Sequence, residues 1–171
     1  MTMKKSNILG IFVGLFIGLV TVLGMSLFTF INLKFNSVYY AQHIPHNEGT
    51  EPDIIMLIEN MGWAYTPEID GISYDDDGMY AITRNKGTKT SILGLSGDTL
   101  YFSSASGDGY LLNHDFSIKT ALDKRYHKIK YNQRKVQKEI RETVQPVIDV
   151  QSKPLINLQW LFNLLYRSRF N

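Results

Sequence analysis

The sequence predicts an α+β protein with one N-terminal transmembrane helix and one small domain that contains an antiparallel sheet. Residues 8–31 form 24 consecutive positions without a charged side chain. Residues 69–118 contain short β-branched and aromatic runs that are separated by turn residues. Residues 52–61 and 119–144 carry apolar side chains at helical spacing. A chain of 171 residues leaves room for one globular domain beside the membrane segment.

The apolar segment 8–31 is long enough to cross a bilayer as a helix. At 1.5 Å per residue it reaches about 36 Å, against a hydrocarbon core of about 30 Å. The rest of the chain is too small to surround it as a core helix. A cleavable signal peptide is the main alternative. The run is longer than the usual apolar region of such a peptide, and no small-residue cleavage site follows it. We therefore predict an uncleaved signal-anchor.

The charges that flank this segment predict its orientation. Lys4 and Lys5 lie in the short N-terminal tail, residues 1–7, whereas only Lys34 follows the segment before Arg84. Basic flanks tend to stay on the cytoplasmic side. We expect a single-pass protein of the plasma (inner) membrane with a cytoplasmic N-terminus and an extracytoplasmic C-terminal domain.

Three glycines of the membrane segment fall on one helix face. Gly10, Gly14 and Gly18 are spaced by four residues, which allows a second helix to approach closely. Glycine is also frequent in membrane helices in general. The glycine face is therefore a predicted site of helix packing, and membrane lipid is the alternative neighbour.

A juxtamembrane linker is predicted at residues 32–51, with Tyr39 and Tyr40 at the headgroup level. The α+β domain, residues 52–150, then opens with a helix at 52–61. Proline suits the first turn of a helix, and Pro52 stands there. An apolar stripe at the spacing of one helix face supports it, formed by Ile54, Leu57, Ile58 and Met61.

The middle of the domain predicts an antiparallel meander of four or five strands. Asp-Gly and Asn-x-Gly sequences supply the positive-φ residues that tight hairpins require. The predicted strands are residues 71–74, 79–84, 88–95, 99–103 and 110–113.

A long basic amphipathic helix is predicted at residues 119–144, ended by Pro146. Its side chains show an a/d repeat formed by Leu122, Tyr126, Ile129, Gln133, Val136, Ile140 and Thr143. One interpretation is a coiled-coil arm that oligomerises or docks a partner. We favour the other, a helix that covers the open face of its own sheet, because a sheet must bury one face.

An apolar C-terminal helix is predicted within residues 151–171. Its apolar residues surround most of the helix, yet it is too short to span a bilayer. It therefore lies in the membrane interface, binds a partner protein, or packs on the domain. The residues predicted to contact a partner or lipid, here and on the preceding helix, are Leu122, Tyr126, Ile129, Val136, Ile140, Trp160, Phe162, Arg167 and Arg169.

The charge is unevenly distributed along the chain. Residues 35–118 hold 12 acidic and 3 basic side chains, whereas residues 119–171 hold 4 acidic and 12 basic ones. This asymmetry bears on partners more than on fold. The two regions pair with each other, or the basic region meets anionic lipid or nucleic acid. Nucleic acid is not expected as a partner of an extracytoplasmic domain.

The sequence holds no recognisable catalytic motif. Cysteine is absent, which excludes disulfides and thiolate chemistry. His43, His46 and Glu48 are read as linker residues, and the acidic run at 75–77 lacks the spacing of a calcium loop. We therefore predict a protein that is not an enzyme, without catalytic, cofactor-binding or metal-binding residues.

The function predicted from these features is that of an interaction or assembly subunit in a membrane or cell-envelope complex. Its partners would be membrane lipid and either a protein partner or further copies of itself, bound through the membrane helix and the C-terminal helices. The alternative is a membrane-tethered ligand-binding or sensory domain that uses the face of its sheet. That alternative requires a pocket lined by aromatic side chains such as Tyr80, Tyr101 and Phe102.

Overall fold

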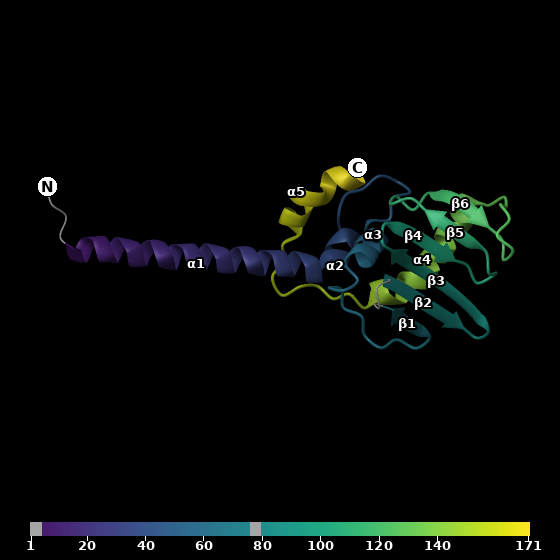
Figure 1. The fold of residues 1–171 in the computed structure, drawn as a ribbon, viewed down its shortest axis with the longest axis horizontal. Helices are drawn as coiled ribbons and strands as arrows, with labels where there is room; N and C mark the ends of the chain where they lie inside the picture. Colours follow the sequence, from purple (N-terminus) through teal and green to yellow (C-terminus); the bar gives the residue numbers. More distant parts are fainter. Residues whose placement is uncertain (1–4, 76–79) are drawn as a thin grey trace.

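One long helix leads directly into an α+β domain (Figure 1). The computed structural model describes residues 5–75 and 80–171 of the chain. Three helices come first, a six-stranded sheet follows, and two helices end the chain. The helices are α1 (Lys5–Phe35), α2 (Ser37–Gln42), α3 (Pro52–Glu59), α4 (Gln133–Asp149) and α5 (Gln159–Phe170). The α+β class and the N-terminal apolar helix are confirmed.

The sheet is an antiparallel meander in which each strand pairs with the next. Its strands are β1 (Ile72–Asp75), β2 (Tyr80–Lys86), β3 (Lys89–Ser96), β4 (Thr99–Ser103), β5 (Gly109–Leu112) and β6 (Ile118–Leu122). The five predicted strands are present where the structure describes them. The beginning of the predicted strand at 79–84 and most of the acidic run at 75–77 lie outside the described residues. The sixth strand occupies residues that were predicted to begin a helix.

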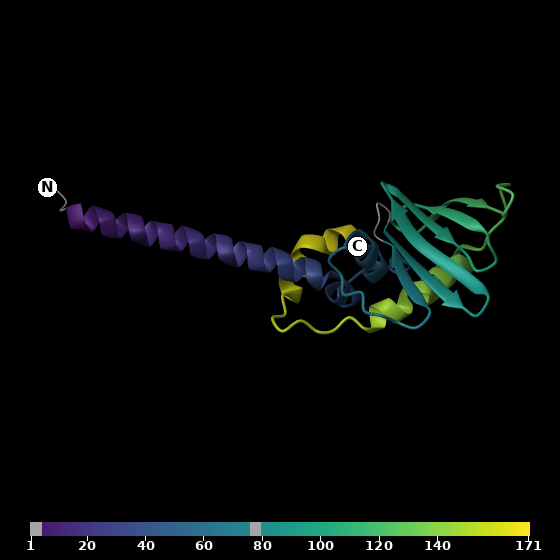
Figure 2. The ribbon, with the colours of Figure 1, turned by 60° about the horizontal axis from the view of Figure 1, so that its bottom comes forward.

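One face of the sheet forms the core of the domain. The strand register places Ile82 opposite Leu93, Leu93 opposite Phe102 and Phe102 opposite Tyr110, so these side chains share that face. All four are buried. Helices α3 and α4 pack against this face, and Figure 2 shows α4 lying across it. Apolar burial of this kind is the main force that holds the two layers together.

The basic helix α4 is shorter at its start and longer at its end than predicted. It begins after Asn132, whose side chain accepts a hydrogen bond from the Lys135 backbone N–H at 3.1 Å. It continues through Pro146, which has no N–H to donate to the carbonyl of Glu142. The guanidinium of Arg84 donates to that carbonyl instead. A side chain from the sheet thus satisfies the group that proline leaves unpaired.

The predicted continuous a/d stripe is divided between three structures. Leu122 ends β6, while Tyr126 and Ile129 lie in the connection that follows. Only the part from Gln133 onward is helical, and there Val136 and Ile140 are buried in the core. The coiled-coil interpretation is therefore wrong for this segment. The helical part covers its own sheet, as we favoured.

Three hairpin turns of one shape explain why residues 119–129 are not helical. In each turn the backbone N–H of the first residue donates a hydrogen bond to the carbonyl of the fifth. The N–H of the fourth residue donates to the carbonyl of the first. The turns begin at Ser104, Asn113 and Asp123. Their fourth residues are Gly107, Phe116 and Tyr126, all with positive φ. This is the geometry of a three-residue hairpin loop with one left-handed residue. Two of the three use an aromatic residue there.

The segment predicted as a linker contains buried helical structure. Helix α1 runs to Phe35, and α2 follows after a single residue, Asn36. Tyr40 is fully buried rather than placed at a headgroup level. Its hydroxyl donates to Asn32 Oδ1 at 2.6 Å and accepts from the Leu158 N–H at 3.1 Å. Burial raises the pKa of Tyr40 above its ordinary value. The end of α1 is therefore built into the domain.

The C-terminal segment returns to the end of α1 and packs beside it (Figure 1). Asn32 Nδ2 donates to the Ile156 carbonyl at 3.1 Å. The ring of Phe162 is fully buried, with its centroid 5.4 Å from that of Tyr40. At the other end of α5, the Phe170 carbonyl accepts from the Asn47 N–H at 2.9 Å. Both ends of α5 are thus fixed to the first part of the chain.

Candidate interaction surfaces

The first candidate surface is the exposed side of α1. Gly10–Phe35 is the one span in the described part of the chain that is long and apolar enough to cross a membrane, with a mean hydropathy of 2.5. Its apolar side chains from Ile11 to Phe28 are exposed. No other part of the described chain comes within 4 Å of a side chain built at Gly10, Gly14 or Gly18. The glycine face is open, and its use in helix packing stays a prediction.

The second candidate surface is apolar and lies where the C-terminal segment meets α1. A groove of about 450 Å³ separates the two, with residues between Val22 and Leu33 on one side and Leu161 and Leu165 on the other. On α1 itself, the rings of Phe30 and Phe35 meet the ring of Trp63 edge to face, at centroid distances of 6.1 and 5.5 Å. Apolar and aromatic groups therefore gather around the last turns of α1.

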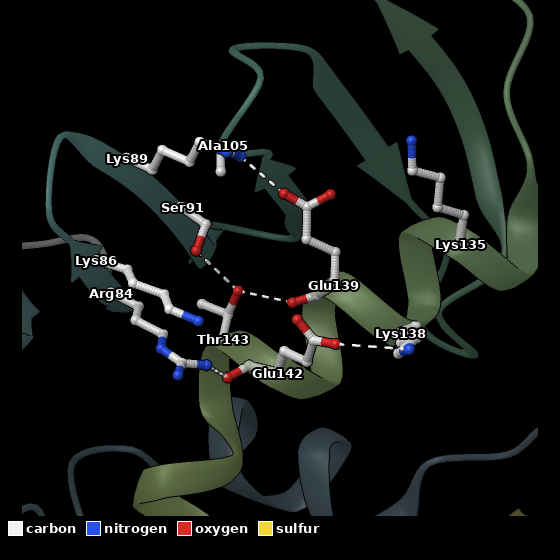
Figure 3. Close-up of a pocket in the computed structure, with 10 residues that line it drawn as sticks. All are labelled: Arg84, Lys86, Lys89, Ser91, Ala105, Lys135, Lys138, Glu139, Glu142 and Thr143. Carbon is white, nitrogen blue, oxygen red and sulfur yellow. Dashed lines mark hydrogen bonds and ion pairs between the residues drawn. The ribbon is translucent and has the colours of Figure 1, made fainter.

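The third candidate surface is a basic groove between α4 and the hairpin of β2 and β3 (Figure 3). Its volume is about 390 Å³. Arg84, Lys86 and Lys89 come from the hairpin, whereas Lys135 and Lys138 come from α4. Glu139 and Glu142 are the acidic residues in its wall. Strands and a helix far apart in sequence thus place five cations around one hollow.

Most of the positive charge in the basic groove is not neutralised by the residues that the structure describes. Glu139 accepts a hydrogen bond from the Ala105 N–H at 2.8 Å, and Glu142 lies 3.9 Å from Lys138. Within residues 5–75 and 80–171, the side chains of Lys86, Lys89 and Lys135 have no hydrogen bond or ion pair. Lys86 also stands directly opposite Lys89 in the strand register.

This arrangement costs the domain stability. Like charges directly opposite each other on paired strands are destabilising. The first turn of α4 carries basic residues and no acidic one, although the positive end of the helix dipole favours acids there. Residues that lower the stability of a protein are often found at its binding sites. The charges suit an acidic partner.

Other basic residues are neutralised within the domain. Arg141 donates to Asp53 at 2.6 and 2.9 Å and also binds Glu51. Arg169 pairs with both carboxylate oxygens of Glu59. Burial raises the pKa of Asp53 and lowers the pKa of Arg141, whereas the bond to Glu59 raises the pKa of Arg169. Acidic residues at the two ends of α3 therefore pair with Arg141 and Arg169, while the groove stays basic.

The predicted contact residues differ in accessibility. Val136, Ile140 and Phe162 are core residues and are not available for contact. Leu122 and Ile129 are half-buried, Arg169 is paired with Glu59, and Tyr126, Trp160 and Arg167 are exposed. The sequence interpretation did not single out Lys86 and Lys89. Their spacing of three residues around Gly87 was the available signal, because a tight hairpin places such residues opposite each other.

Among the aromatic residues proposed to line a ligand pocket, Tyr80 and Phe102 lie on the core face of the sheet and Tyr101 does not. Tyr101 and Phe102 are consecutive in β4 and so point to opposite sides of the sheet. Phe102 is buried in the core, while the ring of Tyr101 lies against Gly94 on the outer side. Beside the core, a hollow of only about 10 Å³ separates α3 from β3 and β4. These residues do not form the pocket that the ligand-binding alternative requires.

The histidines near α2 are held by the backbone. The Nδ1 atom of His43 lies 2.8 Å from the Tyr39 carbonyl, and that of His46 lies 2.8 Å from the Ile44 carbonyl. Among the residues that the structure describes, no three His, Asp or Glu side chains gather as metal ligands. Comparisons with family models, curated proteins and solved structures find no match to this chain. Function is therefore inferred from these surfaces.

Proposed function

We propose that the protein is a non-enzymatic, single-pass interaction subunit that α1 anchors in the plasma membrane, with its domain on the extracytoplasmic side. The observation that carries this proposal is the uncovered apolar length of α1. The end of α1 also supports an uncleaved anchor. Leu33 belongs to the core, and the Lys34 ammonium donates to Asn60 Oδ1 at 2.7 Å. Cleavage after α1 would remove these contacts.

The basic groove supports the proposed role as an interaction subunit. The hairpin turn between β2 and β3 and the start of α4 lie at the end of the domain away from α1 (Figure 1). Lipid of the anchoring membrane would therefore be far from the groove. A protein with an acidic surface is the partner that the charges favour, because opposite charges steer association and set its specificity.

Membrane anchoring is tested by extraction and labelling. The full chain is expected to remain in the membrane fraction after alkaline carbonate washing. The absence of native cysteine allows single reporters at exposed Asp98 and in the N-terminal tail. On intact cells, a membrane-impermeant maleimide should label Asp98→Cys and should label Thr2→Cys only after lysis. Release by carbonate would contradict the anchor, and the opposite labelling pattern would reverse the orientation.

The groove is tested by reversing two of its charges. In mild detergent, the native chain is expected to co-purify with an acidic protein in fixed stoichiometry. The double variant Lys86→Glu, Lys89→Glu should retain at least tenfold less of it, because a tenfold loss needs only about 1.4 kcal/mol and facing like charges cost more than that across an interface. Lys153→Glu is the control, since Lys153 is exposed and does not line the groove. A native chain that is monomeric and alone at every concentration would count against an interaction subunit.

A further inference from the structure

The C-terminal segment exposes large apolar side chains next to α1. Leu155, Ile156, Trp160, Leu164 and Leu165 are all exposed, with Trp160 at 67% and Leu164 at 73%. The opposite side of α5 buries Phe162 and Phe170 in the domain. The helix therefore has two apolar sides, and only one of them is used in the fold.

Hydrogen bonds fix this exposed surface at a defined level of α1. The Ile156 carbonyl is held by Asn32, and the Leu158 N–H is held by Tyr40. Leu161 and Leu165 then face α1 across the groove that reaches from Leu33 back to Val22. At 1.5 Å per residue that stretch of α1 is about 16 Å long, which is half of a hydrocarbon core of about 30 Å.

Part of the backbone of the loop before α5 is paired within the protein, as an apolar medium requires. Irregular backbone in a membrane must have its polar groups satisfied by the protein. Here Asn32 donates to the Ile156 carbonyl, and the Tyr40 hydroxyl accepts from the Leu158 N–H. The Asn157 side chain accepts from the Gln159 N–H at 2.8 Å. Three polar groups of this loop thus have partners within the protein, while Leu155 is fully exposed.

The order of residues along α5 also fits a bilayer boundary. Its first half carries Trp160 and Leu164, and its last turn carries Arg167 and Arg169 beside the domain. Trp63, whose ring packs on Phe30 and Phe35 of α1, is 41% exposed. Tryptophan and arginine are typical of the zone where hydrocarbon meets headgroups.

We infer that residues 155–165 form a second membrane element, which enters the leaflet next to the domain and lies against α1. The occupant of the exposed apolar surface is lipid of the same bilayer. Continuity with the apolar surface of α1 argues for lipid, since both surfaces begin at the same level of the molecule. This inference rests on the proposed anchoring of α1.

The test uses the full chain in nanodiscs of phosphatidylcholine and phosphatidylglycerol with one fluorescent reporter at a time. An NBD label at Leu164→Cys is expected to show blue-shifted emission and to lose most of it to lipids that carry a nitroxide on the acyl chain. A label at Thr90→Cys, exposed on the distal hairpin, should emit as in water and be quenched by aqueous iodide. Leu19→Cys, in the middle of α1, reports the anchor itself.

The outcomes separate the two proposals. Lipid quenching at Leu19→Cys together with aqueous emission at Leu164→Cys would overturn the second membrane element and leave the anchor intact. If Leu164→Cys emits as in water in nanodiscs but is shielded in native membranes, a protein covers this surface and the lipid assignment is wrong. Aqueous emission at Leu19→Cys would overturn the anchor. Triple replacement of Trp160, Leu164 and Leu165 by serine should reduce lipid quenching of a label at Leu155→Cys.

Discussion

The variant Phe162→Ala is expected to lower the free energy of unfolding by about 3–5 kcal/mol, the usual range for removing a buried phenylalanine ring. Phe162 is fully buried, and its ring packs on Tyr40 and on Tyr166, whose centroid lies 4.6 Å away. Loss of the ring would leave a cavity at the point where α5 meets α2. Urea unfolding of the full chain in detergent, followed by near-UV circular dichroism, measures the change.

The control for this prediction lies on the same helix. Ser168 is exposed, so Ser168→Ala is expected to change the free energy of unfolding by less than about 0.5 kcal/mol. Limited proteolysis gives a second measurement. Phe162→Ala should make the segment 151–171 easier to cleave, because Phe162 is one of the two buried side chains that attach α5 to the domain. Equal stability of the two variants would show that Phe162 is not packed as described.

The variant Arg141→Met is expected to cost about 3 kcal/mol, the lower end of the range for breaking a buried ion pair. The side chain of Asp53 is 10% exposed and that of Arg141 is 29% exposed. Without the guanidinium, the Asp53 carboxylate would be buried and unpaired. Its pKa is already raised by burial, so the uncharged form would be favoured further. The same urea unfolding experiment measures the loss.

A double variant separates the ion pair from packing. Asp53→Asn removes the buried charge while keeping the shape of the side chain. The double variant Asp53→Asn, Arg141→Met is therefore expected to be clearly more stable than Arg141→Met alone. If the changes in the free energy of unfolding of the two single variants simply add in the double variant, the carboxylate and the guanidinium do not depend on each other.

The stability of the native chain is expected to depend on pH through the carboxyl group of Asp53. The pKa of Asp53 is higher in the folded state than in the unfolded state. Its contribution to stability is therefore greatest below the unfolded value and is lost as the pH rises through the folded one. The unfolded value is about 4.

Local sequence signals predicted the elements that depend on them. Pro52 opens α3, and glycine-containing turns separate β2 from β3 and β3 from β4. The turns at Phe116 and Tyr126 were not predictable in this way, because aromatic residues rarely adopt positive φ. Without a visible turn, residues 119–129 fitted a helical repeat. The continuation of α4 through Pro146 depends on Arg84, which lies far away in sequence.

For the candidate surfaces too, some features are visible in the sequence and others depend on residues far apart along the chain. The basic composition of the C-terminal region is visible in the sequence, but the groove exists only because the hairpin brings Lys86 and Lys89 to α4. The apolar character of α5 was also visible. The sequence did not show which side of α5 is exposed. Phe162 and Trp160 are both aromatic, and the rest of the chain covers only Phe162.

The single residue between α1 and α2 has a mechanical consequence. A flexible tether would let a domain rotate and bend toward the bilayer. Here Tyr40 and Lys34 bond the end of α1 to the domain, so the domain is expected to follow the tilt of the helix. In the proposed orientation the groove is carried at a constant height above the membrane. A partner of the proposed groove would then have to reach that height to bind, so reach as well as charge would decide which partner fits.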